Sequence, residues 1–382
     1  MKVAVLGYGT VGKGVFEMLT EARGLEQGPV LVRQGKIREI FQTDSMERIL
    51  MDGSIGAVVE TMGGEEPAFS YVSAALRAGK HVVTANKALV AAHGLELARL
   101  ARENGAALLF SAACGGGVPF LHNLSLATQS DRVLTLGGIL NGTTNYMLDA
   151  MQRRDLTYAQ ALADAQELGY AEADPTADVS GLDALRKIML ACAVAFDRLP
   201  GEGLLHEGIE AFTAEDAADL KARGLVCRLV GRGGMAGDQV YAFVEPTLFA
   251  EGAPERSVLD NYNLARYEAK CAGPIVLMGQ GAGRYPTASA VLRDLSDVLQ
   301  GKRAMLSPTC QSARADNSGC GHRYYVRIPA ALAREFPGAD AAESGGIVRL
   351  VTQPMTVLEM HEKASALRQA GAELFFAGIE EA

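Results

Sequence analysis

A glycine-rich turn directly after the first apolar run constrains this chain most. Residues 3–6 are apolar, and the next six, Gly7-Tyr8-Gly9-Thr10-Val11-Gly12, precede an amphipathic segment. In this pattern Gly7 makes a tight turn, Gly9 lets the backbone approach a pyrophosphate, and Gly12 lets a helix pack against the strand. The first helical turn, with Thr10 and Val11, supplies amide donors for phosphates. We therefore predict an α/β fold with a dinucleotide-binding Rossmann domain over residues 1–128.

The position of the second strand decides which nicotinamide cofactor the sequence favours. If the strand is Val30-Leu31-Val32, it ends at Arg33. An acid at that position would hold the ribose of NAD, whereas an arginine accommodates the 2′-phosphate of NADP. If residues 37–41 form the strand instead, no residue of either kind is clear. The first placement, with Lys36 and Arg38 close by, favours NADP, and NAD stays an alternative.

Further strand ends are expected over the cofactor crevice. Residues 57–64 indicate a central strand and its loop, 66–78 a helix, and 81–84 the next strand. Asn86 and Lys87 follow that strand directly, ahead of a helix expected at 94–103 and a strand at 106–110. Because crevices form at the carboxyl ends of parallel strands, Lys87 is a candidate for contacting cofactor or substrate.

Residues 169–187 combine several carboxylates with one lysine. Pro175 and Gly181 disfavour a helix, so residues 172–180 are predicted as a loop, followed by a helix that Ser180 caps. Asp183 and Lys187 are four apart on that helix and share one face. A neighbouring carboxylate favours a charged amine, which suits proton donation to a carbonyl oxygen. The alternative is an exposed ion pair worth about 0.3–0.5 kcal/mol, which the acidic loop and the dinucleotide motif disfavour.

A second, α+β domain is predicted over residues 129–287. It opens with a strand at 133–140 and the polar run Asn141-Gly142-Thr143-Thr144-Asn145-Tyr146, whose amides and hydroxyls suit a carboxylate. Segments at 225–230 and 240–244 indicate an open sheet with a free face and edge, which predicts a homodimer or homotetramer. Before this domain, three consecutive glycines at 115–117 must let the backbone approach something closely.

The C-terminal part is divided by a glycine-rich segment and a polar linker. Gly283 lies in a segment that indicates a ligand-facing helix start, and the helix itself is expected at 288–300. Residues 301–321 are predicted as the linker. Residues 322–382 indicate a small α/β appendage with strands at 324–328, 347–351 and 374–379 and helices at 330–336 and 357–370.

Composition excludes several classes of protein. The net charge of −9 argues against nucleic-acid and anionic-membrane partners, and no apolar run of about 18 residues exists to span a bilayer. The six cysteines include no C-x-x-C pair, so a zinc site or disulfide framework is not expected. We expect a cytoplasmic protein that acts on a small molecule.

Taken together, these motifs resemble homoserine dehydrogenase from residue 1 to about residue 300, in the same order. The motifs that carry the resemblance are the glycine turn at 7–12, Val83-Thr84-Ala85-Asn86-Lys87, Asn141 to Tyr146, Gly169 to Pro175 with Asp178, and Gly181 to Lys187. The resemblance implies NAD(P)-dependent interconversion of L-homoserine and L-aspartate 4-semialdehyde, in threonine and methionine biosynthesis. It also implies that the second domain carries both catalysis and dimerisation.

The resemblance also implies roles for individual residues. Lys187 would be the proton donor, supported by Lys87 and Asp183. The substrate would be bound by Glu172, Asp183, Asp178, Tyr170, Gly142 and Thr143. For the cofactor the resemblance adds Gly169 to the candidates that the sequence itself indicates, which are Gly7, Gly9, Thr10, Val11, Gly12, Arg33, Lys87 and Gly283. A monovalent cation would be bound by the backbone carbonyls of Cys114, Gly116 and Val118.

The sequence departs from the family in three places. The segment between the first helix and Ala57 is shorter than usual, which is why the cofactor preference stays open. The family usually has a glutamate that ligates the cation where this chain has Ser111, so the anionic ligand is missing. The appendage falls where some members carry a threonine-binding ACT domain, but its pattern lacks one strand of that fold and indicates a degenerate ACT-like unit. A dehydrogenase for another small amino aldehyde, or an inactive nucleotide-binding sensor, is the alternative interpretation.

Overall fold

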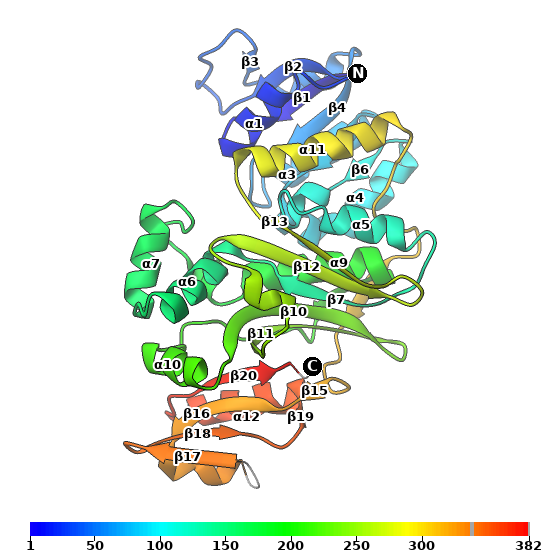
Figure 1. The fold of residues 1–382 in the computed structure, drawn as a ribbon. Coiled ribbons are helices and arrows are strands. Elements are labelled where there is room, and N and C mark those ends of the chain that lie inside the picture. Colours follow the sequence, from blue (N-terminus) through cyan, green and yellow to red (C-terminus); the bar gives the residue numbers. More distant parts are fainter. Residues whose placement is uncertain (337–339, 381–382) are drawn as a thin grey trace.

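The computed structural model describes residues 1–336 and 340–380, which form three tiers along one long axis (Figure 1). The N-terminal domain lies at one end, a middle domain follows, and the C-terminal appendage lies at the other end. Within the described residues, no helix combines the length and the apolar character needed to cross a membrane.

A six-stranded parallel sheet forms the N-terminal domain, in the order β3-β2-β1-β4-β5-β6. This is the strand order of doubly wound dinucleotide-binding folds, so the predicted Rossmann domain is confirmed. The strands are β1 (Lys2–Leu6), β2 (Glu26–Leu31), β3 (Gln42–Thr43), β4 (Ile55–Glu60), β5 (His81–Thr84) and β6 (Leu108–Leu109). The helices are α1 (Thr10–Met18), α2 (Met46–Met51), α3 (Ala68–Arg77), α4 (Lys87–Glu103), η1 (Ser111–Ala113) and α5 (Phe120–Ala127).

Helix α11 (Arg284–Leu299) completes this domain from far along the chain. It packs beside α1, as the yellow helix in Figure 1 shows. It begins four residues earlier than the predicted start at 288. Arg284 pairs with Glu17 of α1, so the first turn of α11 is tied to the N-terminal domain.

Two local expectations in this domain are resolved by the structure. The second strand, β2, ends at Leu31, so Arg33 lies just beyond the strand, as in the first of the two placements, and residues 37–41 form no strand. Helix α4 begins at Lys87 rather than at residue 94, because the Asn86 side chain accepts a hydrogen bond from the backbone N–H of Leu89 at 3.1 Å and caps the helix.

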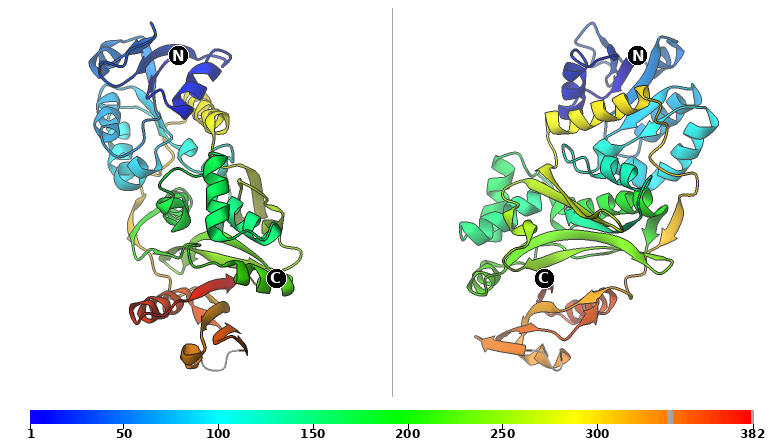
Figure 2. Two further views of the ribbon diagram at one scale, coloured as in Figure 1. Left: turned by 90° about the vertical axis from the view of Figure 1, so that its left-hand side faces the viewer. Right: turned by 45° about the vertical axis from the view of Figure 1, so that its right-hand side comes forward.

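The middle domain is built on an antiparallel sheet in the order β13-β12-β7-β10-β11. Its strands are β7 (Val133–Ile139), β10 (Val226–Ala236), β11 (Gln239–Phe249), β12 (Tyr262–Ala269) and β13 (Gly273–Gln280), with short strands β8 (Arg198–Glu202) and β9 (Leu205–His206). Its helices are α6 (Gly142–Arg153), α7 (Tyr158–Glu167), α8 (Thr176–Val179), α9 (Leu182–Phe196), α10 (Ala214–Ala222) and η2 (Pro254–Ser257). Figure 2 shows the long β10–β11 hairpin crossing the molecule between these helices and the appendage.

The appendage has the strand that its sequence pattern lacked. Its elements are β15 (Gly321–His322), β16 (Tyr324–Pro329), η3 (Ala330–Glu335), β17 (Asp340–Ser344), β18 (Ile347–Val351), β19 (Met355–Thr356), α12 (Val357–Gln369) and β20 (Phe375–Ile379). The expectation of only three strands was wrong, because β17 pairs with β18 and the sheet runs β20-β16-β18-β17. The helix expected at 330–336 is a 3₁₀ helix.

The structure shows two connections between the domains that the sequence analysis did not predict. The predicted linker at 301–321 contains β14 (Gln311–Arg314), which pairs in parallel with β8 of the middle domain. The sheet edge at β11 is not free, because β20 pairs with it, Thr247 opposite Gly378 and Leu248 opposite Ile379. One sheet therefore runs from the middle domain into the appendage.

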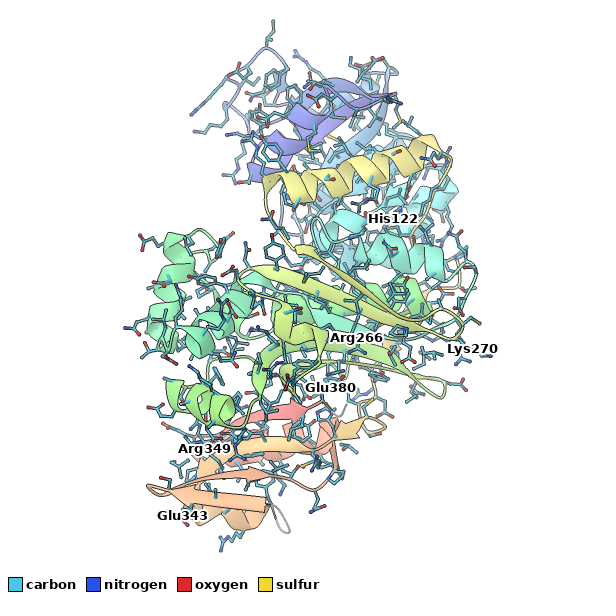
Figure 3. All side chains as sticks on the ribbon, in the orientation of Figure 1. His122, Arg266, Lys270, Glu343, Arg349 and Glu380 are labelled. Atoms are coloured by element: carbon cyan, nitrogen blue, oxygen red, sulfur yellow. The ribbon has the colours of Figure 1, made fainter. Side chains whose placement is uncertain are left out.

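Buried charges hold the junction between the middle domain and the appendage together. Glu245 on β11 is fully buried, and His322 Nε2 lies 2.7 Å and His361 Nε2 3.3 Å from its carboxylate. Burial alone would raise the pKa of Glu245, but hydrogen bonds and charge from the two histidines outweigh it, so the pKa is lowered. Figure 3 shows a second link at this boundary, where Arg266 of β12 lies 3.6 Å from the carboxylate of Glu380.

The Glu245→Gln variant tests the importance of this junction. Glutamine keeps the shape of the side chain but removes the negative charge that the imidazoles contact. We therefore expect the free energy of unfolding to fall by about 2 kcal/mol at pH 6–7. Because the folded pKa lies below the ordinary value of 4.5, the stabilisation is present above that value and is lost as pH falls through the folded pKa. Thermal unfolding from pH 3 to pH 7 measures it, with Glu343→Gln on the exposed strand β17 as control. Equal unfolding midpoints at pH 7 would contradict the assignment.

Candidate active site

The acidic stretch leads into helix α9 through a glycine. Gly181 has a φ of +84° and precedes the helix, and a Cβ there would lie 3.1 Å from Val244 Cγ1. Ser180 does not cap α9, which corrects the prediction, because Gly181 occupies the cap position. The predicted loop at 172–180 also contains the short helix α8. As expected, the buried face of α9 includes Leu185, Ile188 and Cys192.

Asp183 joins two lysines from different domains. Lys187 Nζ lies 2.7 Å from Asp183 Oδ2, and Lys87 Nζ lies 2.7 Å from Asp183 Oδ1. Lys87 is the first residue of α4 in the N-terminal domain, whereas Asp183 and Lys187 lie on α9. The Lys187 side chain is 10% exposed, so the alternative of a solvated surface pair is wrong. The cluster therefore lies in the contact between the two domains.

The cluster keeps its charges despite burial. Burial alone would raise the pKa of Asp183, but the charges of Lys187 and Lys87 lower it well below its usual range. Burial likewise acts to lower the pKa of Lys187, and the carboxylate of Asp183 raises it above its ordinary value. Asp183 and Lys187 are therefore a charged pair at neutral pH, and the ammonium of Lys187 is the form from which a proton can be donated.

Asn141 contacts two of the predicted site residues, although the sequence analysis did not single it out. Its side-chain Nδ2 donates to Asp178 Oδ1 at 2.7 Å and to Asp183 Oδ2 at 2.9 Å. Its Oδ1 accepts from the backbone N–H of Thr144 at 2.8 Å and caps α6. Burial raises the pKa of Asp178, although Asn141 acts against that rise. An asparagine at the end of a strand and the start of a helix was the available signal.

A backbone carbonyl also holds the buried lysine. Lys187 Nζ donates to the carbonyl oxygen of Leu140 at 2.5 Å, at the end of β7. Cys114 Sγ lies 3.9 Å from the carbonyl oxygen of Lys187, and burial raises the pKa of this thiol to about 12. A thiol with such a pKa stays neutral at neutral pH.

The structure brings some of the predicted substrate-binding residues together and leaves Glu172 apart from them. Thr143 Oγ1 donates to the carbonyl oxygen of Tyr170 at 2.5 Å, and a Cβ at Gly142 would lie 2.7 Å from the carbonyl oxygen of Asn261. Glu172 is exposed, and in the described part of the chain its carboxylate forms no ion pair. The structure thus joins Thr143 to Tyr170 and Asp178 to Asp183 through Asn141, but it does not bring Glu172 to the lysines.

The three consecutive glycines do pack against a backbone segment. A Cβ at Gly116 would lie 2.5 Å from the carbonyl oxygen of Gly281, and the N–H of Gly117 donates to the carbonyl oxygen of Gln280 at 3.0 Å. The predicted close approach is therefore to the segment that leads into α11. This contact ties the loop at 114–118 to the segment that returns the chain to the N-terminal domain.

The set of ligands expected for a monovalent cation is incomplete. Both the Oγ and the backbone N–H of Ser111 are bonded to buried Asp294 of α11, and the carbonyl of Val118 already accepts from the N–H of Phe120 at 2.8 Å. Among the described residues no cluster of His, Cys, Asp and Glu side chains suits a metal ion.

A cavity of about 1010 Å³ lies at the carboxyl ends of the parallel strands. It is lined by Gly7, Tyr8, Gly9, Leu31, Val32, Arg33, Gln34, Lys36, Asp44, Ser45, Thr61, Met62, Gly63, Glu66, Pro67 and Tyr71. Gly7 has a φ of +98°, and a Cβ at Gly9 would meet no atom within 4 Å, so this turn leaves open space for a ligand. The residues fit a dinucleotide, with the start of α1 at Thr10 and Val11 next to the turn.

Lys87, Gly169 and Gly283 are cofactor candidates that lie outside the cavity lining. Gly169 and Gly283 have φ values of +74° and +119°. Lys87 follows Asn86, whose Nδ2 donates to the carbonyl oxygen of Gly64 at 2.6 Å, next to the lining residue Gly63. The side chain of Lys87 contacts the carboxylate of Asp183.

Sequence profiles of known protein families match both the N-terminal and the middle domain. The sequence profile of "Homoserine dehydrogenase, NAD binding domain" matches residues 7–111, and that of "Homoserine dehydrogenase" matches residues 119–296. A homoserine dehydrogenase of Synechocystis is 36% identical over 347 residues, which cover 86% of this chain and 79% of that protein. One of Lactococcus lactis is 38% identical over 318 residues, covering 78% of this chain and 74% of that protein.

A solved structure is similar over the whole length. The homoserine dehydrogenase from Thiobacillus denitrificans has a TM-score of 0.87 and 30% sequence identity, covering 100% of this chain and 98% of that chain. The family profiles, the relatives and the shared fold all indicate homoserine dehydrogenase. None of them favours a dehydrogenase for another small amino aldehyde or an inactive nucleotide-binding sensor. The chain belongs to the homoserine dehydrogenase family, a family of NAD(P)-dependent oxidoreductases that interconvert L-homoserine and L-aspartate 4-semialdehyde.

Proposed function

We propose that Lys187 transfers the proton in this reaction and that Asp183 and Lys87 hold it in place. The observation that carries the proposal is the pair of 2.7 Å contacts that Asp183 makes with the two lysines. When bound, the nicotinamide exchanges a hydride with the substrate carbon. In the reducing direction the Lys187 ammonium donates a proton to the aldehyde oxygen, and in the oxidising direction the amine takes it back.

For the substrate, we propose that carboxylates bind the ammonium and that α6 binds the carboxylate. Glu172, Asp178 and Asp183 are the acids near the start of α9, and an ammonium group requires such partners. Gly142 and Thr143 lie in the first turn of α6, where free amide groups attract an anion, and the backbone of Tyr170 is already joined to Thr143. Gly169 and Gly283 remain proposed cofactor contacts.

The Lys187→Ala variant tests the role in proton transfer. Removal of the amine should lower kcat at least ~100-fold in both directions, because the group that transfers the proton is lost, while nucleotide affinity stays nearly unchanged. Steady-state rates and nucleotide binding by fluorescence measure the two effects. Lys270→Ala, in the turn between β12 and β13, is the control and should leave both unchanged. Near-normal turnover of Lys187→Ala would show that the role is wrongly assigned.

The Asp183→Asn variant tests the electrostatics of the cluster. The carboxylate raises the pKa of Lys187, so its loss leaves burial dominant and lowers that pKa. Reduction needs the protonated amine, so the alkaline limb of its pH–rate profile should move to lower pH by about one pH unit or more. A profile of kcat/KM for aldehyde reduction from pH 6 to pH 11 measures it. An unmoved alkaline limb would contradict the proposed coupling.

We propose NADP as the preferred cofactor, with NAD as the alternative. Arg33 follows β2 and lines the nucleotide cavity together with Lys36, which supports binding of a 2′-phosphate. Asp44 lines the same cavity, and its carboxylate accepts a 3.3 Å hydrogen bond from the N–H of Gly35. The balance of charge at this end of the cavity favours a phosphate over a free ribose.

The Arg33→Ala variant tests this preference. It should raise KM for NADP at least ~10-fold and change KM for NAD little, because only NADP carries the 2′-phosphate. Initial rates with homoserine and each cofactor, side by side, measure it. Arg38→Ala, outside the cavity lining, is the control. A wild-type enzyme that is faster with NAD and insensitive to Arg33→Ala would overturn the proposal.

We also propose that the chain forms a homodimer or homotetramer across the open face of its middle sheet. Residues of β13 alternate between exposed and partly buried, and its outward side chains include Val276 and Met278, 45% and 57% exposed. An apolar face of this kind suits burial against a second copy.

We propose that the reaction takes place in the cytoplasm, in the biosynthesis of threonine and methionine. All six cysteines are unpaired, which is typical of proteins in reducing compartments.

A further inference from the structure

A second cavity lies at the C-terminal end of α6 and shares no lining residue with the nucleotide cavity. Its volume is about 360 Å³. It is lined by Asp149, Gln152, Arg153, Lys221, Gly224, Leu225, Val226, Arg228, Arg256 and Leu259. Four of these residues are basic and one is acidic. No part of the proposed reaction uses them.

The charge of Arg228 is poorly compensated. The residue is 1% exposed, and its guanidinium makes only long hydrogen bonds, 3.3 Å to the carbonyl oxygen of Glu255 and 3.4 Å to Asp149 Oδ1 and the carbonyl oxygen of Arg256. Within the described residues its Nη1 is buried without a hydrogen-bond partner. A buried guanidinium with an unpaired nitrogen is costly unless a further acceptor reaches it.

The single carboxylate of the cavity is shared. Asp149 also accepts from Arg153 Nη1 at 3.1 Å and from the N–H of Asp260 at 3.3 Å. Lys221 pairs at 3.2 Å with Asp155, whose side chain is 76% exposed, and Arg256 donates only to backbone carbonyl oxygens. The protein therefore offers four cationic groups to this cavity against one buried anion.

We propose that this cavity binds a small oxyanion, a phosphate or a carboxylate. Such a group supplies the acceptors that Arg228 and Arg256 lack, and guanidinium groups bind these two anions in a planar, two-point geometry. The ligand would lie at one end of α6, whose other end is capped by Asn141, the residue that bonds Asp178 and Asp183. The cavity is thus a binding site for an anionic effector.

Calorimetric titration with inorganic phosphate and, in parallel, with succinate tests the proposal. NADP⁺ is kept saturating so that the nucleotide cavity is filled, and ionic strength is held constant with chloride. We expect saturable binding of at least one anion with a Kd below about 10 mM, and the tighter of the two identifies the ligand class. Absence of saturable binding of both would overturn the proposal.

Variants locate the binding. Arg153→Ala combined with Lys221→Ala removes two cations whose side chains are 56% and 58% exposed, so the fold is kept, and the affinity should fall at least ~10-fold. The matched control removes two cations elsewhere, Lys270→Ala with Arg314→Ala, and should bind as the wild type does. Arg228→Met should abolish binding, with its unfolding midpoint recorded alongside. Equal affinity in the first double variant and the wild type would place the anion elsewhere and contradict the assignment.

Discussion

The active site depends on one carboxylate that is held between two ammonium groups in a place that excludes most water. Without Lys87 and Lys187, burial would favour the neutral acid at Asp183, and without Asp183 it would favour the neutral amine at Lys187. The charges of Asp183 and Lys187 are thus stable only because their partners are present. Since Lys87 comes from the N-terminal domain, the cluster forms only when the two domains are in contact.

The rest of the fold positions that cluster. The chain leaves the Rossmann sheet after β6, builds the middle domain, returns as α11 and then runs to β14, which pairs with β8, so it passes between the two domains three times. Strand β11 links the site to the appendage. Val244 on one face of the strand packs near Gly181 at the start of α9, and Glu245 on the opposite face contacts the histidines of the appendage. A substitution at the junction between the middle domain and the appendage therefore affects a strand that packs directly against the active-site helix α9.

Much of this arrangement could be predicted from local patterns. The glycine turn, the parallel strands and the four-residue spacing of Asp183 and Lys187 depend on residues close in sequence, and the structure confirms them. What the sequence could not predict depends on tertiary contacts. Gly181 replaces Ser180 at the start of α9 because β11 packs closely there, and Asn141 bonds two aspartates that are distant from it in the chain. Strand β17 and the pairing of β20 with β11 likewise need partners that no local pattern shows.

NMR titration of the Lys187 ammonium, with isotopically labelled lysine, shows whether Asp183 keeps this buried amine charged. The signal is assigned by its loss in a Lys187→Arg variant. We expect the amine to stay charged throughout neutral pH and to lose its proton only above its ordinary pKa of 10.5, because Asp183 outweighs burial. Titration clearly below that value in the wild-type protein would show that burial dominates and that the charged cluster is wrongly assigned.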